Sequence, residues 1–231
     1  MKVLEKTIAY SPPLLYSKID GIKSIDGTEA EGWLISIGGT PKEMMSRSPE
    51  FTYKRLIAAS KMAKNFGAEI MGLGAFTKVV GDAGVTVAKH SSIPITTGNS
   101  YSASAALWAA ADAMKRMAII DIPSGKKKIK AKSMVIGATG SIGSVSSKLL
   151  SMVFDEVILC GRNTEKLNNL KNSIYLDSPH TKIITTTDSS KYLSEADMIV
   201  TATSGAGKKV LDIMKVKPGC VITDVARPLD L

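Results

Sequence analysis

Cysteine, aromatic residues and long apolar runs are all scarce in this chain of 231 residues. The two cysteines, Cys160 and Cys220, cannot build a disulfide scaffold and lack the spacing of a metal site, which favours a reducing compartment. No apolar run approaches the length that crosses a bilayer, and the N-terminus has no signal-peptide core followed by a cleavage site. We therefore expect a cytoplasmic globular protein without a transmembrane segment or a metal site.

Acidic residues are also in deficit, because 21 Asp and Glu against 30 Lys and Arg give a net charge of +9. Such an excess attracts polyanions, namely nucleic acid, a membrane surface or an acidic protein. Aromatic residues make up only 5% of the chain and do not interleave with basic ones, which argues against nucleic acid as a partner. The densest basic run, residues 125–132, is either a solvated approach to a strand or a docking site for an acidic protein.

The most informative stretch is residues 134–162, MVIGATGSIGSVSSKLLSMVFDEVILCGR. It has the strand, glycine turn, helix, strand order of a dinucleotide-binding unit. Gly137 allows the tight turn, Gly140 lets the backbone approach a pyrophosphate, and Gly143 lets the helix lie close to the strand. We expect a cofactor to be held by the turn, the end of the second strand and a later loop: Gly137, Ala138, Thr139, Gly140, Ser141, Ile142, Gly143, Arg162, Asn163, Thr203 and Ser204.

The residues after the second strand indicate which dinucleotide is bound. NAD-selective sites usually place Asp or Glu there to hold the ribose 2′-hydroxyl group. This chain has Gly161, Arg162 and Asn163 instead. A guanidinium pairs well with a 2′-phosphate, whereas a carboxylate repels it. The sequence therefore predicts NADP(H), the alternative being that Arg162 is a solvated surface residue.

Alternating apolar runs and helical patterns predict an α/β fold with a parallel sheet and two domains. A small N-terminal α/β domain would span residues 1–120, including an interdomain helix at 100–118, and a Rossmann domain would span 121–231. Residues 1–30 are turn-rich, and 81–92 are expected to be a loop. The expected strands are a buried one at 33–37 and others at 70–73, 93–96, 182–186, 198–202 and 220–223. The expected helices follow Pro41, Ser48, Asn99 and Gly143, with a polar one at 164–171 and a short one around Lys191.

Four segments resemble the cyanobacterial long-chain acyl-[acyl-carrier-protein] reductases, which make fatty aldehydes with NADPH. They are MGLGAFTKVV (71–80), ITTGNSYSA (95–103), VIGATGSIGS (135–144) and LCGRNTEKLNNL (159–170). The resemblance spans nearly the whole chain, and the first two segments are specific, because a general Rossmann protein need not contain them. It implies a small N-terminal domain joined to a Rossmann domain, with the substrate cleft between them.

The resemblance also implies a reaction, in which an acyl thioester is reduced to an aldehyde. The acyl group would come from acyl-CoA or from an acidic acyl carrier protein, which fits the basic charge of this chain. In the family the acyl group passes to a cysteine, which thiolate chemistry suits. That cysteine is expected in a C-terminal segment beyond Leu231, so neither Cys160 nor Cys220 occupies its place. Cys160 is expected in the core, and Cys220 stays a weak catalytic candidate.

Other candidate residues lie in the N-terminal half of the chain. The substrate cleft is expected to be lined by Gly74, Phe76, Thr77, Thr97, Gly98 and Asn99. Lys78 or His90 could donate a proton for carbonyl reduction without any cysteine. Such chemistry would suit a small-molecule oxidoreductase of shikimate-dehydrogenase or methylene-tetrahydrofolate-dehydrogenase type. A second alternative is a dinucleotide-binding module without catalysis. The oligomeric state is open, a homo-oligomer included.

Overall fold

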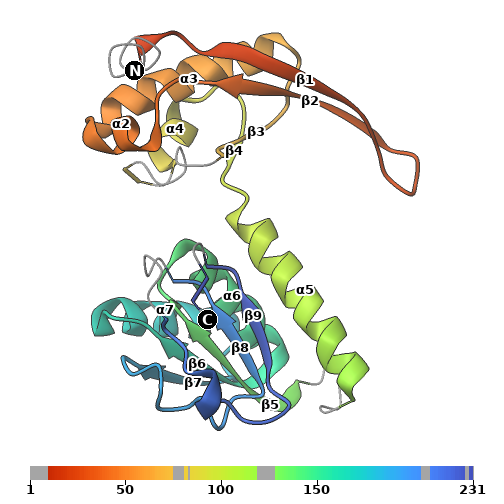
Figure 1. The fold of residues 1–231 in the computed structure, drawn as a ribbon, viewed down its shortest axis with the longest axis vertical. Coiled ribbons are helices and arrows are strands. Elements are labelled where there is room, and N and C mark those ends of the chain that lie inside the picture. Colours follow the sequence, from red (N-terminus) through yellow and green to blue (C-terminus); the bar gives the residue numbers. More distant parts are fainter. Residues whose placement is uncertain are drawn as a thin grey trace. The chain divides into compact units, whose positions relative to one another are not determined.

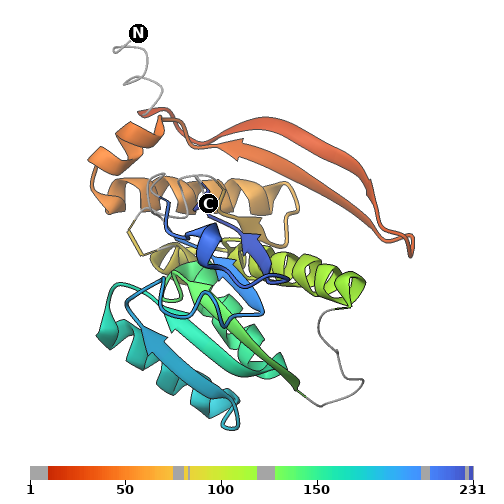
Figure 2. The same cartoon turned by 60° about the horizontal axis from the view of Figure 1, so that its bottom comes forward.

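The computed structural model describes residues 10–74, 81–82, 84–118, 128–203, 209–226 and 229–230. The chain divides into two compact units, residues 1–98 and 99–231. Figures 1 and 2 show the helices and strands of each unit. No helix in the described ranges is long and apolar enough to cross a membrane.

The first unit begins with a β-hairpin that the sequence analysis missed. Strands β1 (Leu14–Lys23) and β2 (Glu29–Ser36) pair antiparallel and form a two-stranded ribbon (Figures 1 and 2). Turns were expected through residues 1–30, but residues 14–23 form a strand, because the two Asp-Gly pairs differ in role. Gly21 lies at a register shift inside β1, and only Gly27 belongs to the connecting turn. The strand expected at 33–37 overlaps the last residues of β2, but every residue of β2 is exposed or half-buried.

Short helices and a small parallel pair of strands complete the first unit. Its remaining elements are α2 (Pro41–Ser46), α3 (Pro49–Asn65), β3 (Met71–Gly72), α4 (Val85–His90) and β4 (Ile95–Thr96). A small core holds them together: Ile37, Leu56, Ala59, Leu73 and Val87. The loop expected at 81–92 contains α4, because the Asp82 carboxylate accepts hydrogen bonds from the Thr86 backbone N–H and hydroxyl at 2.9 and 2.6 Å. This local bond stabilises the first turn, which the sequence pattern did not reveal.

The second unit is built around a five-stranded parallel sheet, which confirms the predicted α/β class. Its elements are α5 (Asn99–Met117), β5 (Ile129–Ile136), α6 (Ser141–Val153), β6 (Phe154–Cys160), α7 (Thr164–Asp177), β7 (Lys182–Thr186), β8 (Met198–Thr201), the 3₁₀ turn η2 (Ile213–Lys215) and β9 (Val221–Asp224). The strand order is β7-β6-β5-β8-β9, and all neighbours are parallel. The order reverses between β5 and β8, and open α/β sheets bind ligands at the carboxyl ends of such strands.

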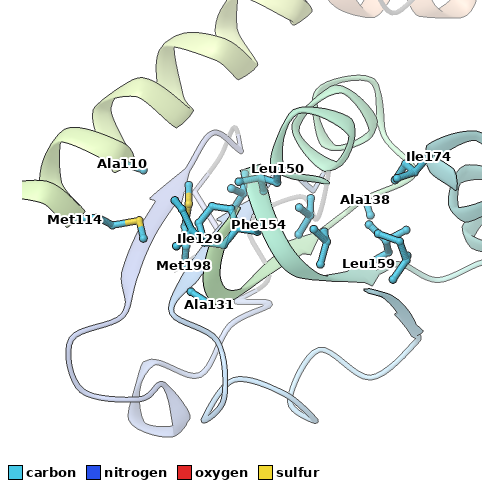
Figure 3. Packing of buried hydrophobic residues seen from close by; sticks show 14 of the residues in the cluster. Ala110, Met114, Ile129, Ala131, Ala138, Leu150, Phe154, Leu159, Ile174 and Met198 are labelled. Carbon is cyan, nitrogen blue, oxygen red and sulfur yellow. The ribbon is translucent and has the colours of Figure 1, made fainter. Parts of the chain in front are cut away.

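Both faces of this sheet are buried, as the continuous apolar strands predict. One face packs against α5, α6 and α7, and Figure 3 shows Ala110 and Met114 of α5 beside Ile129 and Met198. The helix expected at 100–118 is α5, and its buried Ala110 and Met114 join this core. The other face is covered by segments around Leu193 and Leu211 that form turns, so the helix expected at Lys191 is absent.

Candidate dinucleotide-binding site

The glycine turn after β5 lies against the ends of two neighbouring strands. The backbone N–H groups of Gly137 and Ala138 both donate to the carbonyl oxygen of Cys160, the last residue of β6, at 2.9 Å. On the other side, the N–H of Ala202 donates to the carbonyl of Ile136 at 2.8 Å. The turn therefore occupies the carboxyl edge of the sheet where the strand order reverses, which is the place expected for a dinucleotide.

Two of the three glycines are required by close backbone packing. Gly137 has φ 84°, and a Cβ atom there would lie 2.6 Å from the carbonyl oxygen of Ala202. A Cβ atom on Gly143 would lie 2.1 Å from the carbonyl oxygen of Gly137. Real side chains do not approach backbone atoms so closely, so a larger residue at Gly137 would push Ala202 away, and one at Gly143 would push α6 away from the turn.

The N-terminus of α6 presents uncapped donors next to this turn. Gly140 is the N-cap residue, and no side chain accepts a hydrogen bond there. The first-turn N–H groups of a helix have no intrahelical acceptor, and the helix dipole favours anions at this end. Gly140 and Ser141 are exposed, so nothing bulky in the described chain covers these donors. These residues fit a dinucleotide pyrophosphate, which Ser141, Ile142 and Gly143 would hold through their backbone N–H groups.

Arg162 follows β6 at the same edge. A Cβ atom on Gly161 would lie 3.5 Å from the Thr139 hydroxyl, so the start of this segment touches the glycine turn. The Arg162 side chain is exposed, and it forms no ion pair with any residue that the structure describes. Asn163 has a structural role as well, because its Oδ1 accepts from the Lys166 N–H at 2.9 Å and caps α7. The NH₂ group of the Asn163 side chain then remains for a ligand.

Thr203 is held by a carboxylate that the sequence analysis did not single out. Asp230 is 1% exposed, and its two oxygens accept from the Thr203 N–H at 3.1 Å and the Thr203 hydroxyl at 2.5 Å. The Asp230 N–H in turn donates to Asp224, the last residue of β9, at 2.8 Å. Thr203, shortly after β8, is thus held by a residue that follows β9. Ser204, also expected at the cofactor, lies outside the described residues.

We expect Asp230→Asn to loosen this contact, because an amide cannot accept both hydrogen bonds from Thr203. Leaving a buried donor without an acceptor costs about 1–3 kcal/mol. Urea unfolding should show a loss in that range, and titration should show weaker cofactor binding. Asp155→Asn, an exposed carboxylate at the opposite edge of the sheet, serves as the control and should change neither. Equal unfolding midpoints for the two variants would contradict the proposed role of Asp230.

The two cysteines lie at opposite edges of the sheet, Cys160 at the carboxyl edge and Cys220 at the amino edge. Cys160 is buried, and burial followed by the charge of Asp188 raises its pKa to about 11. Cys220 precedes β9 at the amino edge, so the strand length alone places it about 13 Å from the carboxyl edge. Its pKa is also raised to about 11, by burial and then by Asp197. Neither thiol is activated as a nucleophile, and Cys220 is also far from the glycine turn.

The raised pKa of Cys220 predicts that its thiol is alkylated slowly. At pH 8 about one-thousandth of such a thiol is ionised, against about one-tenth for the ordinary pKa of 9.0. The higher nucleophilicity of the more basic thiolate recovers about tenfold, so the rate should be about tenfold below that of a model thiol. Rates of iodoacetamide labelling, followed by mass spectrometry, should rise with pH up to about 11, and Cys220→Ser should keep full cofactor binding. Fast labelling at pH 7 would show that the thiol is activated after all.

His90 is the last residue of α4, in the first unit, and is exposed. Its Nδ1 lies 2.9 Å from the Thr86 carbonyl, so this nitrogen donates its proton and Nε2 remains for another partner. Lys78 lies outside the described residues, as do Phe76 and Thr77. Within the described residues, the structure therefore gives His90 a position but no catalytic partner.

The remaining cleft residues come together at the ends of β3 and β4. The N–H of Leu73 donates to the Thr96 carbonyl at 2.7 Å, which brings Gly74 close to Thr97 although they are far apart in sequence. Gly98 continues from Thr97, and its N–H donates to the Thr96 hydroxyl at 3.3 Å. Asn99 begins α5 and belongs to the second unit.

The fold and the site define a nicotinamide-dinucleotide-binding oxidoreductase domain of Rossmann type. Residues 109–231 match the family model described as shikimate / quinate 5-dehydrogenase, and the chain belongs to this family. The match covers more than half of the chain, and it includes β5 to β9 and the glycine turn.

Two curated relatives cover nearly the whole chain. Aminotransferase PigE of Serratia sp. is 29% identical over 91% of this chain and 23% of its own length. The long-chain acyl-[acyl-carrier-protein] reductase of Synechococcus elongatus is 27% identical over 96% of this chain and 63% of its own length. The resemblance expected from the four segments is therefore confirmed, while the chain spans less than two thirds of either relative.

Among solved structures, the NAD complex of a D-isomer specific 2-hydroxyacid dehydrogenase from Lactobacillus delbrueckii ssp. bulgaricus is similar at a TM-score of 0.38. It is 16% identical, and the likeness covers 72% of this chain and 52% of that one.

Proposed function

We propose that the protein is an NADPH-dependent reductase that converts an acyl thioester to an aldehyde. The observation that carries the cofactor choice is the position of Arg162, which follows β6 directly beside the glycine turn. Residues 161–163 contain no carboxylate that could hold a ribose 2′-hydroxyl group or repel a 2′-phosphate. An exposed guanidinium without an acidic partner in the described chain is suited to a phosphate.

The choice of an acyl thioester rests on the similarity to the Synechococcus reductase over 96% of this chain. A net charge of +9 supports an acidic carrier protein as the donor of the acyl group. A nicotinamide dinucleotide supplies the hydride in such enzymes. The balanced reaction is acyl thioester plus NADPH plus a proton, giving aldehyde, free thiol and NADP⁺.

The residues of this chain contribute binding and orientation to that reaction. The 137–143 turn would hold the pyrophosphate, Arg162 the 2′-phosphate, and the Thr203 loop would border the cofactor on the β8 side. Neither Cys160 nor Cys220 suits acyl transfer, so the proposal routes no step through either thiol. Gly74, Thr97, Gly98 and Asn99 remain the proposed substrate contacts.

The reaction is tested by incubating the chain with NADPH and either palmitoyl-CoA or palmitoyl carrier protein. We expect NADPH oxidation, aldehyde and free thiol in equal amounts, with the carrier protein preferred at low salt, because charge attraction is screened by ions. Free thiol without aldehyde would indicate thioester hydrolysis and contradict the proposal. NADPH binding without turnover on any thioester would favour a module that only binds the dinucleotide.

A second candidate is a dehydrogenase of a small polar alcohol, favoured by the family match over residues 109–231. This activity would appear as NADP⁺ reduction with shikimate or quinate and no reaction with thioesters. The same two assays therefore separate the candidates.

A further inference from the structure

The first unit contains a half-open pocket between the end of β2, helix α2 and helix α3. It includes the backbone of Gly38 and Gly39 and the side chains of Glu43, Arg47, Phe51 and Arg55. Two arginines in one small pocket are unusual, because like charges out of water repel each other and are costly to desolvate. None of these residues belongs to the dinucleotide site in the second unit.

In each arginine, one guanidinium nitrogen donates a hydrogen bond to another residue of the protein. Arg47 Nη2 donates to Glu43 at 2.9 Å, and Arg55 Nε donates to the Ile37 carbonyl at 3.0 Å. The other ends, Arg47 Nη1 and Arg55 Nη2, are buried and have no acceptor among the described residues. Buried donors without an acceptor are rare, and they indicate either a loss of folding stability or a missing ligand.

The surroundings hold both guanidinium groups in position. The Cζ atoms of Arg47 and Arg55 lie 4.8 and 5.1 Å from the centre of the Phe51 ring. Burial, and then the positive charge of Arg47, lower the pKa of Arg55. The positive charge of Arg55 is therefore not balanced by a nearby negative charge. Among the described residues that line the pocket Glu43 is the one carboxylate, and it already forms an ion pair with Arg47. An anion that reached both free donors would provide acceptors for them and offset the repulsion. Because these two atoms are closed off from solvent, the side chains around them would have to move apart to admit it.

We propose that this pocket binds an oxyanion and that its occupant is a phosphoryl group. One guanidinium group comes from the residue that follows α2 and the other from α3, and a tetrahedral group with three free oxygens can accept hydrogen bonds from both at once. A single planar carboxylate would meet the two donors less well. The ligand would be free phosphate or a phosphate monoester, and it would bind independently of the dinucleotide and of the proposed reaction.

The pocket is tested by titrating the full chain with inorganic phosphate, phenyl phosphate and acetate, followed through backbone amide NMR signals. We expect saturable shifts at Gly38 and Gly39 with both phosphates and weaker binding of acetate. A stronger response to phenyl phosphate would identify a phosphorylated ligand, and a stronger response to inorganic phosphate the free anion. Shifts confined to residues 140–143, or acetate binding as tightly as phosphate, would overturn the assignment.

Variants link the binding to the two arginines. Arg55→Gln should weaken phosphate about 10- to 100-fold, as expected for loss of a charged hydrogen bond. Lys54→Gln removes the same charge from an exposed neighbour and should leave the affinity unchanged. Glu43→Gln frees Arg47 and removes a negative charge, so it should tighten phosphate binding, which a misfolded variant could not do. Equal affinities for Arg55→Gln and Lys54→Gln, or weaker binding by Glu43→Gln, would refute the proposal.

Discussion

Gly143→Ala is expected to abolish dinucleotide binding and to destabilise the second unit by about 3 kcal/mol, the upper range for overpacking a buried site. The added methyl group would lie 2.1 Å from the Gly137 carbonyl oxygen and 2.8 Å from its carbon, both backbone atoms that cannot rotate away. Helix α6 would have to shift, and with it the N–H groups that would bind phosphate. Urea unfolding and a cofactor titration measure the two effects.

Gly140→Ala is the matched control for this variant, because it adds the same methyl group to the same turn. Gly140 has φ −76°, which alanine adopts freely, and the new Cβ atom would lie 3.3 Å from the Gly137 oxygen. That distance is tight but can be relieved by a small adjustment, so the loss of stability should be much smaller. The packing account of α6 is wrong if Gly143→Ala unfolds at the same urea concentration as Gly140→Ala.

Arg162→Gln is expected to weaken NADPH binding by about 10- to 100-fold while leaving NADH binding nearly unchanged. The lost interaction is a charged hydrogen bond to the 2′-phosphate, which contributes about 1.5–3 kcal/mol. Arg162→Asp should go further and favour NADH, because a carboxylate accepts from the ribose 2′-hydroxyl group and repels a 2′-phosphate. Fluorescence titration with the two cofactors measures both ratios.

Lys148→Gln controls for the change in net charge, since Lys148 is exposed on α6 two turns beyond the glycine turn. A general electrostatic effect would weaken NADPH binding equally in Lys148→Gln and Arg162→Gln. A specific 2′-phosphate contact would affect Arg162→Gln alone. An unchanged ratio of NADPH to NADH affinity in Arg162→Gln would remove the argument for NADP(H).

The second unit could be predicted from sequence almost element by element. Strand β7 has the predicted bounds, and β8 and β9 differ from prediction by one residue at either end or less. A parallel sheet buried on both faces produces continuous apolar runs, and turns with glycine separate them clearly. The first unit is harder to predict from sequence. The β1–β2 hairpin has no buried face, so its apolar and polar residues do not alternate regularly.

The candidate site was predictable only where its residues are close in sequence. The glycine turn and Arg162 belong to one local unit, and the structure places them side by side. Asp230 could not be foreseen as the partner of Thr203, since the contact depends on how the end of the chain returns to β8. The Arg47 and Arg55 pocket was missed for a similar reason, because no sequence motif marks these two arginines.

The central claim is that a 2′-phosphate lies at Arg162 while the pyrophosphate lies at the N-terminus of α6. The most direct test is to titrate the chain with adenosine 2′,5′-diphosphate and with adenosine 5′-diphosphate while following amide and guanidinium NMR signals. The account predicts shifts at Ser141, Ile142 and Gly143 with both ligands, and a shift of the Arg162 guanidinium with the 2′-phosphate alone. Equal Arg162 shifts with both ligands, or none at residues 141–143, would contradict it.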